Sequence, residues 1–572
     1  MRHFIKLWST ILPMNILKNN KQYDIIIVGM GLAGIRAAIT AAKKGSKVLI
    51  CAKSTVCSGS SFYTLMDTLH CQVTINEEDK KLFMQDIIDC SYGMNDRIMN
   101  QYYIDHIRTR IKEFPEMGVE YTKLPEPKLA CFASHPHDLY SFSDWGKIRN
   151  NVRTIFTEHP NIDVAEQTEA ISIITGESDG RSFVKGIVLY DKKNSVHSYV
   201  MAPSIILATG GFGALYEHNL NSPDVAGGGH VLALHAGAEL INLEFNQFIP
   251  GFIEPIYKVV FREGTLDYCE KLVDETGEDV LKKLLPKEKE YHDCIHLRSF
   301  HGPFTSVDKS KYFDIALMES CRKNNHTKGV EITYSPAIYE DERSYFKTYL
   351  DWLEQEYHVN LCDEKVTIAP FFHAANGGIY INHSCETKVL GLFACGEASG
   401  GIHGADRLGG NSTGSCLVFG NLAAESAVTH ANFMGHKNCD VSKSELLSAV
   451  QKSYDSGKEN VLPPQEIIAR IKKVMWIHAN ILRSESSLTT ALKEIRTMKD
   501  QFNAMPYLLQ GEHCMAAVQA NHFLILSEAL CLAMLNRKES RGSHYREDYP
   551  SMDSAYEKRF KIIQKENQLY CI

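Results

Sequence analysis

The stretch "YDIIIVGMGLAGIRAAITAAKKGSKVLICAK", residues 23–53, decides the fold expected for this chain. The run Tyr23–Val28 is short, apolar and rich in β-branched residues, which is typical of a buried strand. The alanine-rich segment Ile35–Lys44 predicts a helix that ends at Gly45, and Lys47–Cys51 predicts a second strand. The stretch therefore predicts a β-α-β unit.

Three glycines stand between the first strand and the helix. Gly29, Gly31 and Gly34 form the pattern G-x-G-x-x-G in the context that a dinucleotide-binding turn requires. The first glycine makes the turn, the second lets a pyrophosphate approach the backbone, and the third lets helix and strand pack closely. Because the start of the helix offers free N–H groups to phosphates, we expect a dinucleotide here and assign Leu32 and Ala33 to its site as well.

The second strand ends differently from most units of this kind. An acid usually stands there and binds a ribose hydroxyl, but this chain has Ala52 and Lys53. The ribose must therefore find another partner. Downstream, Ile205–Ala208 predicts another buried strand, which runs into a glycine-rich turn that we also assign to cofactor binding. The residues of that turn are Thr209, Gly210 and Gly211.

Length and composition limit the possible classes. A chain of 572 residues should form about two to four domains. A net charge of -8 argues against a nucleic-acid-binding protein, which would present a basic face. The sequence has no run of about 18 apolar residues, so we expect no membrane span. The 16 cysteines are scattered without a C-x-x-C pair, so we expect reduced thiols in a cytoplasmic protein and no local zinc or iron–sulfur ligand set.

The pattern changes along the chain. Residues 1–20 contain no acid and are expected to be an N-terminal extension: a weak targeting segment, a disordered extension or the product of a start placed too early. Glycine clusters disappear between about 250 and 365, where the chain becomes more charged, and this favours an inserted domain. From about 463 the pattern is helical.

Several longer motifs then occur in a fixed order: "ILATGGFG" (206–213), "GAELINLEFNQF" (237–248), "HAANGG" (373–378), "GLFACGEASGGIHGADRLGGNS" (391–412) and "SRGSHYREDYP" (540–550). With the first glycine motif, they resemble the flavoprotein subunits of succinate dehydrogenase and fumarate reductase, and L-aspartate oxidase. The resemblance covers nearly the whole chain after residue 20 and is weakest at about 255–365.

The resemblance implies an α/β fold in which a Rossmann-like FAD-binding domain is interrupted by an α+β capping domain and followed by a C-terminal helical domain. The expected ranges are 21–245 and 366–435 for the two parts of the FAD-binding domain, 246–365 for the capping domain and 436–572 for the helical domain. FAD, rather than NAD, is the implied cofactor. The resemblance also makes Lys53 less unusual, since these flavoproteins often have serine-lysine at the end of the second strand.

Further cofactor contacts follow from the same resemblance. Glu397 corresponds to the acid beside the flavin ribityl chain, while Asn411 and Ser412 begin a helix whose positive end points at the flavin ring. The segment "CSGSSFYT" (57–64), with Ser58, Ser60 and Ser61, contains no histidine where succinate dehydrogenases attach FAD covalently, and His70 is a poor match. We therefore expect noncovalent FAD.

The implied substrate site is only partly complete. Arg407 matches the arginine that holds a substrate carboxylate, and His373 matches a histidine that contacts one. Ile249 stands where the family has a substrate-binding histidine. In "VFREGT" (260–265), Arg262 could replace that histidine as an anion contact or be a surface residue, and Glu263 matches a family acid.

The family's proton-donating arginine has no clear counterpart, because its P-R-D motif is absent. Arg298 and Lys311 are the two candidates, Arg298 by its chemistry and Lys311 by its position.

The sequence thus predicts an FAD-dependent oxidoreductase that transfers a hydride between flavin and a small carboxylate. Electrons would pass to or from a separate partner, such as an iron–sulfur subunit, or dioxygen. The alternatives are L-aspartate oxidase, which feeds NAD synthesis, and a non-catalytic FAD-bearing subunit. No metal site, nucleic acid or membrane span is expected.

Overall fold

A computed structural model of the chain describes residues 16–18, 21–323, 328–436, 439–442, 444–446, 462–503 and 512–572. At its centre is a parallel sheet with the strand order β18-β11-β2-β3-β7. Its strands are β2 (Ile25–Val28), β3 (Val48–Cys51), β7 (Ile162–Ala165), β11 (Ser204–Leu207) and β18 (Leu392–Ala394). The strands expected at 23–28, 47–51 and 205–208 are β2, β3 and β11, and all three are fully buried, as apolar strands of a covered parallel sheet should be.

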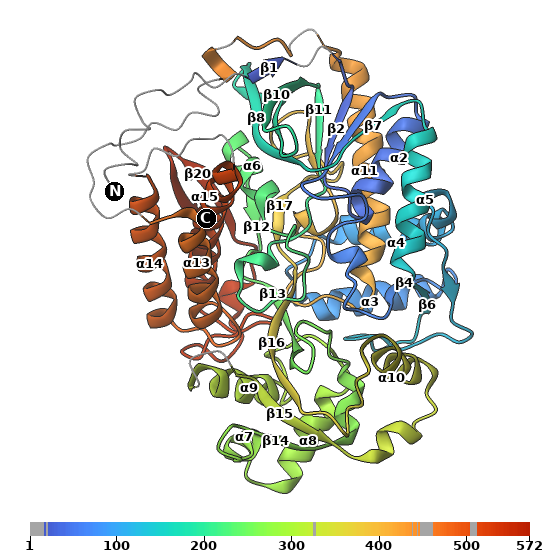
Figure 1. The fold of residues 1–572 in the computed structure, drawn as a ribbon, viewed down its shortest axis with the longest axis vertical. Coiled ribbons are helices and arrows are strands. Elements are labelled where there is room, and N and C mark those ends of the chain that lie inside the picture. Colours follow the sequence, from blue (N-terminus) through green and yellow to red (C-terminus); the bar gives the residue numbers. More distant parts are fainter. Residues whose placement is uncertain are drawn as a thin grey trace.

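Two helices from distant parts of the chain pack side by side against this sheet (Figure 1). They are α2 (Leu32–Lys43), which is the helix expected after the glycine turn, and α11 (Asn411–Met434). A Cβ atom on Gly34 would lie 1.9 Å from the carbonyl oxygen of Gly29. The third glycine of the motif is therefore required for the close approach of α2 to the turn after β2, in agreement with the sequence prediction.

Three further sheets lie in the same part of the molecule, in the orders β1-β10-β9-β8, β4-β6-β5 and β19-β17-β12-β20-β21. Their strands are β1 (Ile16–Lys18), β4 (Leu69–Val73), β5 (Thr122–Lys123), β6 (Asp138–Phe142), β8 (Thr168–Ser178), β9 (Arg181–Asp191), β10 (Val196–Met201), β12 (Leu240–Ile241), β17 (Gly378–Tyr380), β19 (Ser399–Gly400), β20 (Lys561–Lys565) and β21 (Gln568–Cys571). The helices of this part are α3 (Asp79–Ser91), α4 (Arg97–Ile111), α5 (Trp145–Glu158) and α6 (Gly228–Ala236). Of the expected extension 1–20, residues 16–18 pair with β10 and the remainder lies outside the described residues.

The segment between β12 and β17 forms a body with an apolar core of its own, drawn in green and yellow at the bottom of Figure 1. Its sheet has the order β13-β16-β15-β14, with β13 (Asn246–Glu254), β14 (Cys269–Val273), β15 (Val330–Tyr334) and β16 (Val366–Ala375). Its helices are α7 (Val280–Leu284), α8 (Glu288–Arg298), α9 (Lys311–Lys323) and α10 (Ser344–Tyr357). A separate apolar core is what an independently packed capping domain requires, and the expected bounds 246–365 stay a prediction.

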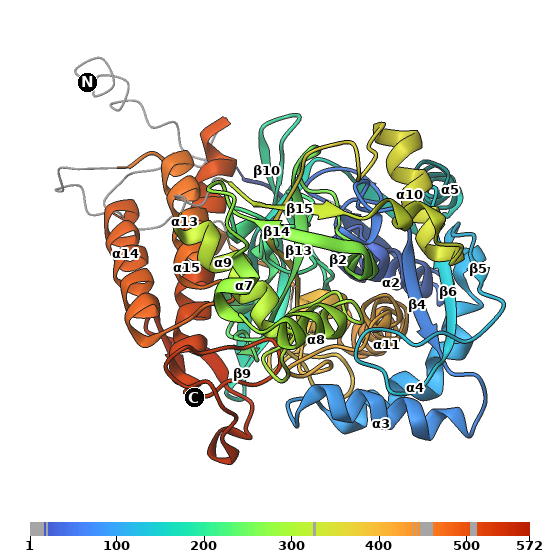
Figure 2. The ribbon, with the colours of Figure 1, turned by 90° about the horizontal axis from the view of Figure 1, so that it is seen from below.

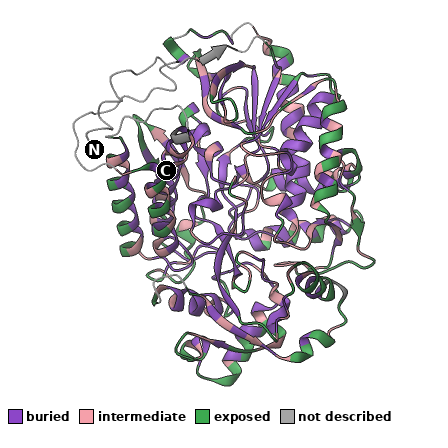
Figure 3. Cartoon of the chain, in the orientation of Figure 1, coloured by how far each residue is buried: buried purple, intermediate pink, exposed green. Residues whose placement is uncertain are grey.

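The C-terminal part contains the helices α13 (Pro464–His478), α14 (Glu485–Asn503) and α15 (Glu512–Asn536), which pack on one another. Figures 1 and 2 place them on the side of the molecule opposite the β4-β6-β5 sheet. Within the described ranges, α15 holds one segment, Cys514–Asn536, that is long and apolar enough to cross a membrane, but 78% of its most apolar window is buried inside the protein. Exposed residues instead follow the outer face of α14 (Figure 3).

Candidate active site

A cavity of about 1160 Å³ lies where the central sheet, α11 and the capping body meet. Most of the residues predicted for the site line it. For the cofactor these are Gly29, Gly31, Leu32, Ala33, Lys53, Ser58, Ser60, Ser61, Thr209, Gly210, Glu397 and Ser412, and for the substrate His373, Arg407 and Glu263. Residues separated by almost 400 positions in the sequence thus share one cavity, which is large enough for a dinucleotide and a small substrate.

Three predicted cofactor residues lie just behind the wall. Gly34 packs α2 on the turn after β2, as described above. Gly211 lies against the Glu397 carboxylate, because a Cβ atom there would be 2.6 Å from its Oε1. Asn411 begins α11, and its Oδ1 accepts a hydrogen bond of 3.2 Å from the Tyr103 hydroxyl. These residues shape the wall and do not line the cavity.

The structure does not bring Arg298 or Lys311 to the cavity wall. Arg298 is fully buried, and its guanidinium pairs with Asp314 at 2.7 Å and donates to the backbone carbonyl of Gly302 at 2.7 Å. The Lys311 ammonium donates to the Ser306 carbonyl at 3.3 Å. Because both side chains are engaged elsewhere, the geometry does not support either one as the proton donor.

At least three helices, α2, α6 and α11, begin at the cavity with their N-terminal backbone groups uncapped by side chains. In the described structure, α2 starts after Gly31 and α11 after Gly410, and neither has a capping side-chain hydrogen bond or an acid in its first turn. Leu32, Ala33 and Ser412 in these first turns line the cavity. Uncapped helix starts attract anions through their free N–H groups and the helix dipole.

The Lys53 end of the cavity contains two partly buried acids that the sequence analysis missed. Glu169 on β8 lies 3.9 Å from the Lys53 ammonium, and burial raises the pKa of its carboxyl group. Asp224 also lines the cavity there. Either acid could bind the ribose that lacks a partner at Ala52. Neither had a motif that would mark it, since both become neighbours of Lys53 only through the tertiary fold.

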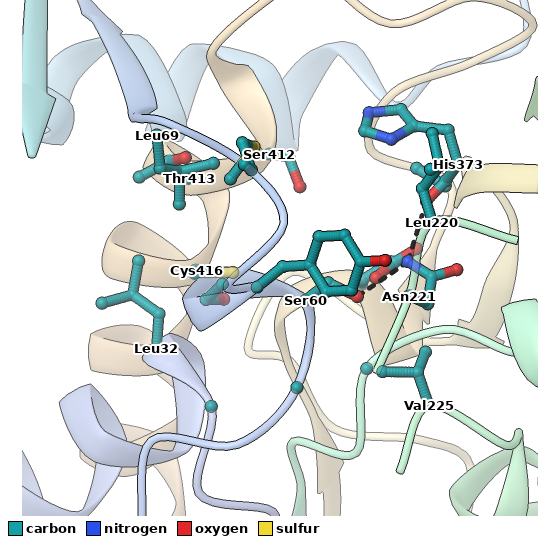
Figure 4. Close-up of a pocket in the computed structure, with 18 of the residues that line it drawn as sticks. Leu32, Ser60, Leu69, Leu220, Asn221, Val225, His373, Ser412, Thr413 and Cys416 are labelled. Carbon is teal, nitrogen blue, oxygen red and sulfur yellow. Dashed lines mark hydrogen bonds between the residues drawn. The ribbon is translucent and has the colours of Figure 1, made fainter. Parts of the chain in front are cut away.

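A β-bulge presents His373 to the cavity. Gln247 pairs with Ala374 and Phe248 with Phe372, so His373 is the extra residue on β16. Asn221 stabilises this arrangement, because its side-chain nitrogen donates to the Ser60 hydroxyl at 2.8 Å and to the His373 carbonyl at 3.0 Å. Figure 4 shows this bridge beside the Ser412 end of α11.

Arg407 is a buried cation held by an uncharged partner. Its Nε and Nη2 groups donate to Gln247 Oε1 at 3.1 and 2.8 Å, and its side chain is buried. Burial lowers the pKa of the guanidinium, and the nearby Glu397 opposes this shift. Gln247 is 160 positions away from Arg407 in the sequence, so no local pattern could have identified it.

The neighbouring groups differ in charge. Burial, with the Arg407 and Arg262 guanidinium groups nearby, lowers the pKa of His373 to about 3, so its imidazole is neutral at ordinary pH. Arg262 also lines the cavity, as the sequence suggested, but it pairs with the buried Asp67 carboxylate. The Glu263 carboxylate accepts a hydrogen bond of 3.4 Å from Cys131.

The loop that carries Cys131 is fixed from behind. Asp86 on α3 accepts hydrogen bonds from the backbone of Ser134 at 3.1 Å and of His135 at 3.2 Å, and from His137 Nε2 at 3.1 Å. His137 is fully buried and also contacts Asp79 at 2.8 Å through Nδ1. This group of side chains holds the cavity-lining loop in place.

With this geometry established, sequence comparison identifies the family. The profile of the FAD binding domain matches residues 24–413, and that of the C-terminal region of the fumarate reductase flavoprotein matches residues 468–569. The chain belongs to the family of fumarate reductase and succinate dehydrogenase flavoproteins and L-aspartate oxidase. FAD is therefore its cofactor, as the sequence predicted, and it is an FAD-dependent oxidoreductase by family.

Proteins of several kinds are similar to this chain along nearly their whole length. A fumarate reductase (CoM/CoB) subunit from Methanothermobacter marburgensis is 26% identical, over 95% of this chain and 97% of that protein. The L-aspartate oxidase of Vibrio cholerae is 25% identical, over 92% and 96%. Among solved structures, Sdh1 of Mycobacterium smegmatis superimposes with a TM-score of 0.79 at 22% identity, covering 96% of this chain and 94% of that one.

The residues present fit FAD. The uncapped starts of α2 and α11 suit its phosphates and flavin, and Gly31 leaves open space, since a Cβ atom there would meet nothing closer than 3.6 Å within the protein. Ser58, Ser60 and Ser61 add hydroxyl groups along the same wall.

Proposed function

We propose that this chain oxidises or reduces the bond between two carbons of a small carboxylic acid, as a reductase of the fumarate reductase type. The observation that carries the proposal is Arg407, a buried guanidinium on the wall of the FAD cavity whose side-chain hydrogen-bond partner is the uncharged Gln247. A buried cation of this kind is stabilised by an anionic guest.

Arg407 has hydrogen-bonding capacity left for a carboxylate. A guanidinium has five N–H groups, and Gln247 takes one from Nε and one from Nη2. The three that remain include both N–H groups of Nη1, on the side of the fork that Gln247 does not occupy. A carboxylate can accept two of them in a parallel, bidentate arrangement, which fixes the orientation of the substrate.

The other residues have distinct roles in this proposal. Bound FAD supplies the hydride chemistry. His373, being neutral, donates one hydrogen bond to the substrate without adding charge. Glu263 exchanges the proton at its carboxylate oxygens, since it lines the cavity and already accepts a hydrogen bond from Cys131. A separate donor or acceptor, either a partner protein or dioxygen, completes the electron balance.

The test is anaerobic reduction of the bound FAD followed by mixing with unsaturated acids, beginning with fumarate. We expect reoxidation of the flavin by at least one acid, and a loss of about 100-fold or more in Arg407→Gln, since charge-assisted hydrogen bonds contribute about 1.5–3 kcal/mol each. Lys128→Gln is the matched control, because Lys128 is an exposed cation on the same cavity wall. No response to any acid, with FAD fully bound, would favour a non-catalytic FAD-bearing subunit.

One observation favours L-aspartate oxidase as a second candidate. Cys131 donates a hydrogen bond of 3.4 Å to the Glu263 carboxylate. Burial raises the pKa of its thiol, and the nearby Glu263 charge adds to this shift while the Arg407 charge opposes it. An acid and a guanidinium on either side of one position would suit the ammonium and carboxylate groups of an amino acid. Hydrogen peroxide formed from L-aspartate and dioxygen would support this activity.

A further inference from the structure

The cavity wall near Arg407 is apolar on one side. We call this surface the apolar wall and define it as Tyr63, Met66, Leu220, Ile249 and Val260, which all line the cavity. They belong to one hydrophobic cluster, separate from the larger cores. Except for the partly buried Met66, each is at most 8% exposed.

The apolar wall is continuous with the groups proposed to bind the substrate. Ile249 is two residues beyond Gln247 on β13, the strand that holds Arg407 through Gln247. Leu220 precedes Asn221, which donates to the His373 carbonyl. A carboxylate on Arg407 would therefore leave the rest of its molecule near hydrocarbon.

The charges at this end allow for one acid group. Arg262 is already neutralised by its ion pair with Asp67, whose side chain is only 5% exposed. His373 is uncharged. Glu263 also lines this part of the cavity and would repel a second carboxylate. An unpaired charge buried against the apolar wall would cost several kcal/mol.

The lining of the cavity also includes two large apolar side chains that are exposed to solvent. Leu129 and Phe300 line it, and they are 57% and 59% exposed, which is unusual for side chains of this size. They come from the loop before β6 and the segment after α8. A guest longer than four carbons could therefore extend its hydrocarbon end past the buried wall.

We propose that the substrate has a single carboxylate and an apolar body, as in a 2-enoic acid with a hydrocarbon substituent, and that C4 dicarboxylates are poor ligands. This inference rests on the proposed function, because it takes Arg407 as the carboxylate site. The reaction consumes two electrons from the separate donor and two protons, and converts the C=C bond of the enoic acid into a C–C bond.

Binding to the oxidised holoprotein tests the inference without turnover, since oxidised FAD cannot reduce an enoic acid. Crotonate, trans-2-hexenoate, cinnamate and fumarate are titrated while the flavin absorbance spectrum and the heat of binding are recorded. We expect trans-2-hexenoate to bind about 15-fold tighter than crotonate, at about fourfold for each of two methylene groups, and at least tenfold tighter than fumarate.

Ile249→Thr and Ile253→Thr are the matched variants. Both isoleucines lie on β13 and belong to the same cluster, but Ile253 does not line the cavity. We expect Ile249→Thr to weaken trans-2-hexenoate at least fivefold and Ile253→Thr to change it less than twofold. If neither variant folds, the chain-length series with the wild-type protein still decides.

The two proposals fail in different ways. Fumarate binding as tightly as trans-2-hexenoate, with the affinity lost in Arg407→Gln, would overturn this inference and leave the proposed function intact. Equal weakening in the two isoleucine variants would also overturn it. If no acid binds the wild-type holoprotein, or binding is unchanged in Arg407→Gln, the proposed function itself fails.

Discussion

Replacing Gly34 by alanine should break the FAD-binding turn by steric overlap alone. The new Cβ atom would lie 1.9 Å from the carbonyl oxygen of Gly29, about 1.5 Å short of van der Waals contact. The position of the Cβ atom is fixed by the backbone of α2 and the oxygen belongs to the backbone of the turn, so α2 must move away from the turn. Overpacking typically costs 1–3 kcal/mol, and we expect about 3 kcal/mol here, or a fall in melting temperature of about 2–3 °C for a chain of 572 residues.

Gly31→Ala is the matched control for this experiment. Its Cβ atom would meet only Ser58 O, at an ordinary 3.6 Å, and the backbone φ of -78° at Gly31 suits alanine. The Gly31→Ala substitution therefore adds a methyl group that faces the cavity and does not overlap other protein atoms. We expect the FAD-free Gly31→Ala protein to melt like wild type but to bind FAD at least tenfold more weakly.

The assay is thermal unfolding of both variants with and without FAD, together with FAD titration by flavin fluorescence. A Gly34→Ala protein that melts at the wild-type temperature would refute the steric argument. A FAD-free Gly31→Ala protein that melts as early as Gly34→Ala would show that the two glycines do not have the separate roles described here.

Three further predictions concern the groups around the cavity. Lys311→Gln should retain turnover within about twofold, because Lys311 does not line the cavity. A roughly 100-fold loss of turnover would instead indicate that Lys311 is the proton donor. Since the pKa of His373 is about 3, acid binding should show no inflection near pH 6.5, and one that disappears in His373→Gln would contradict this. Burial alone would raise the pKa of Asp86, but hydrogen bonds from His137 and from the Ser134 backbone hold this pKa below its ordinary value. The ionised Asp86 carboxylate therefore stabilises the fold above about pH 4, and this stabilisation is lost as the pH falls further. Asp86→Asn should therefore lower the free energy of unfolding by about 1–3 kcal/mol at pH 7 and by less at pH 3 in denaturant titrations; a difference independent of pH would argue against this.

The central architecture could be predicted because it is written in local patterns. The turn at Gly29–Gly34 and the buried strands on either side have strong periodic signals, and the structure has β2, α2 and β3 within a few residues of the expected ranges. The reason given for Gly34 also agrees with the observed packing.

The substrate end was harder to predict because its geometry depends on pairings across the chain. Gln247 and Asp67 determine whether Arg407 and Arg262 are available, and they lie 160 and 195 positions away. Arg298 had suitable chemistry for a proton donor, but its pairing with the buried Asp314 could not be seen in the sequence. Whether a long polar side chain is available to bind substrate or donate a proton depends on its hydrogen-bond and ion-pair partners more than on its residue type.

The most direct test of the account is the rate at which the reduced FAD of the purified protein is reoxidised by its best acid, compared between wild type and Arg407→Gln at equal FAD content. We expect a fall of about 100-fold or more, with the flavin fully retained. Reoxidation within tenfold of the wild-type rate would contradict the claim that Arg407 binds the substrate carboxylate.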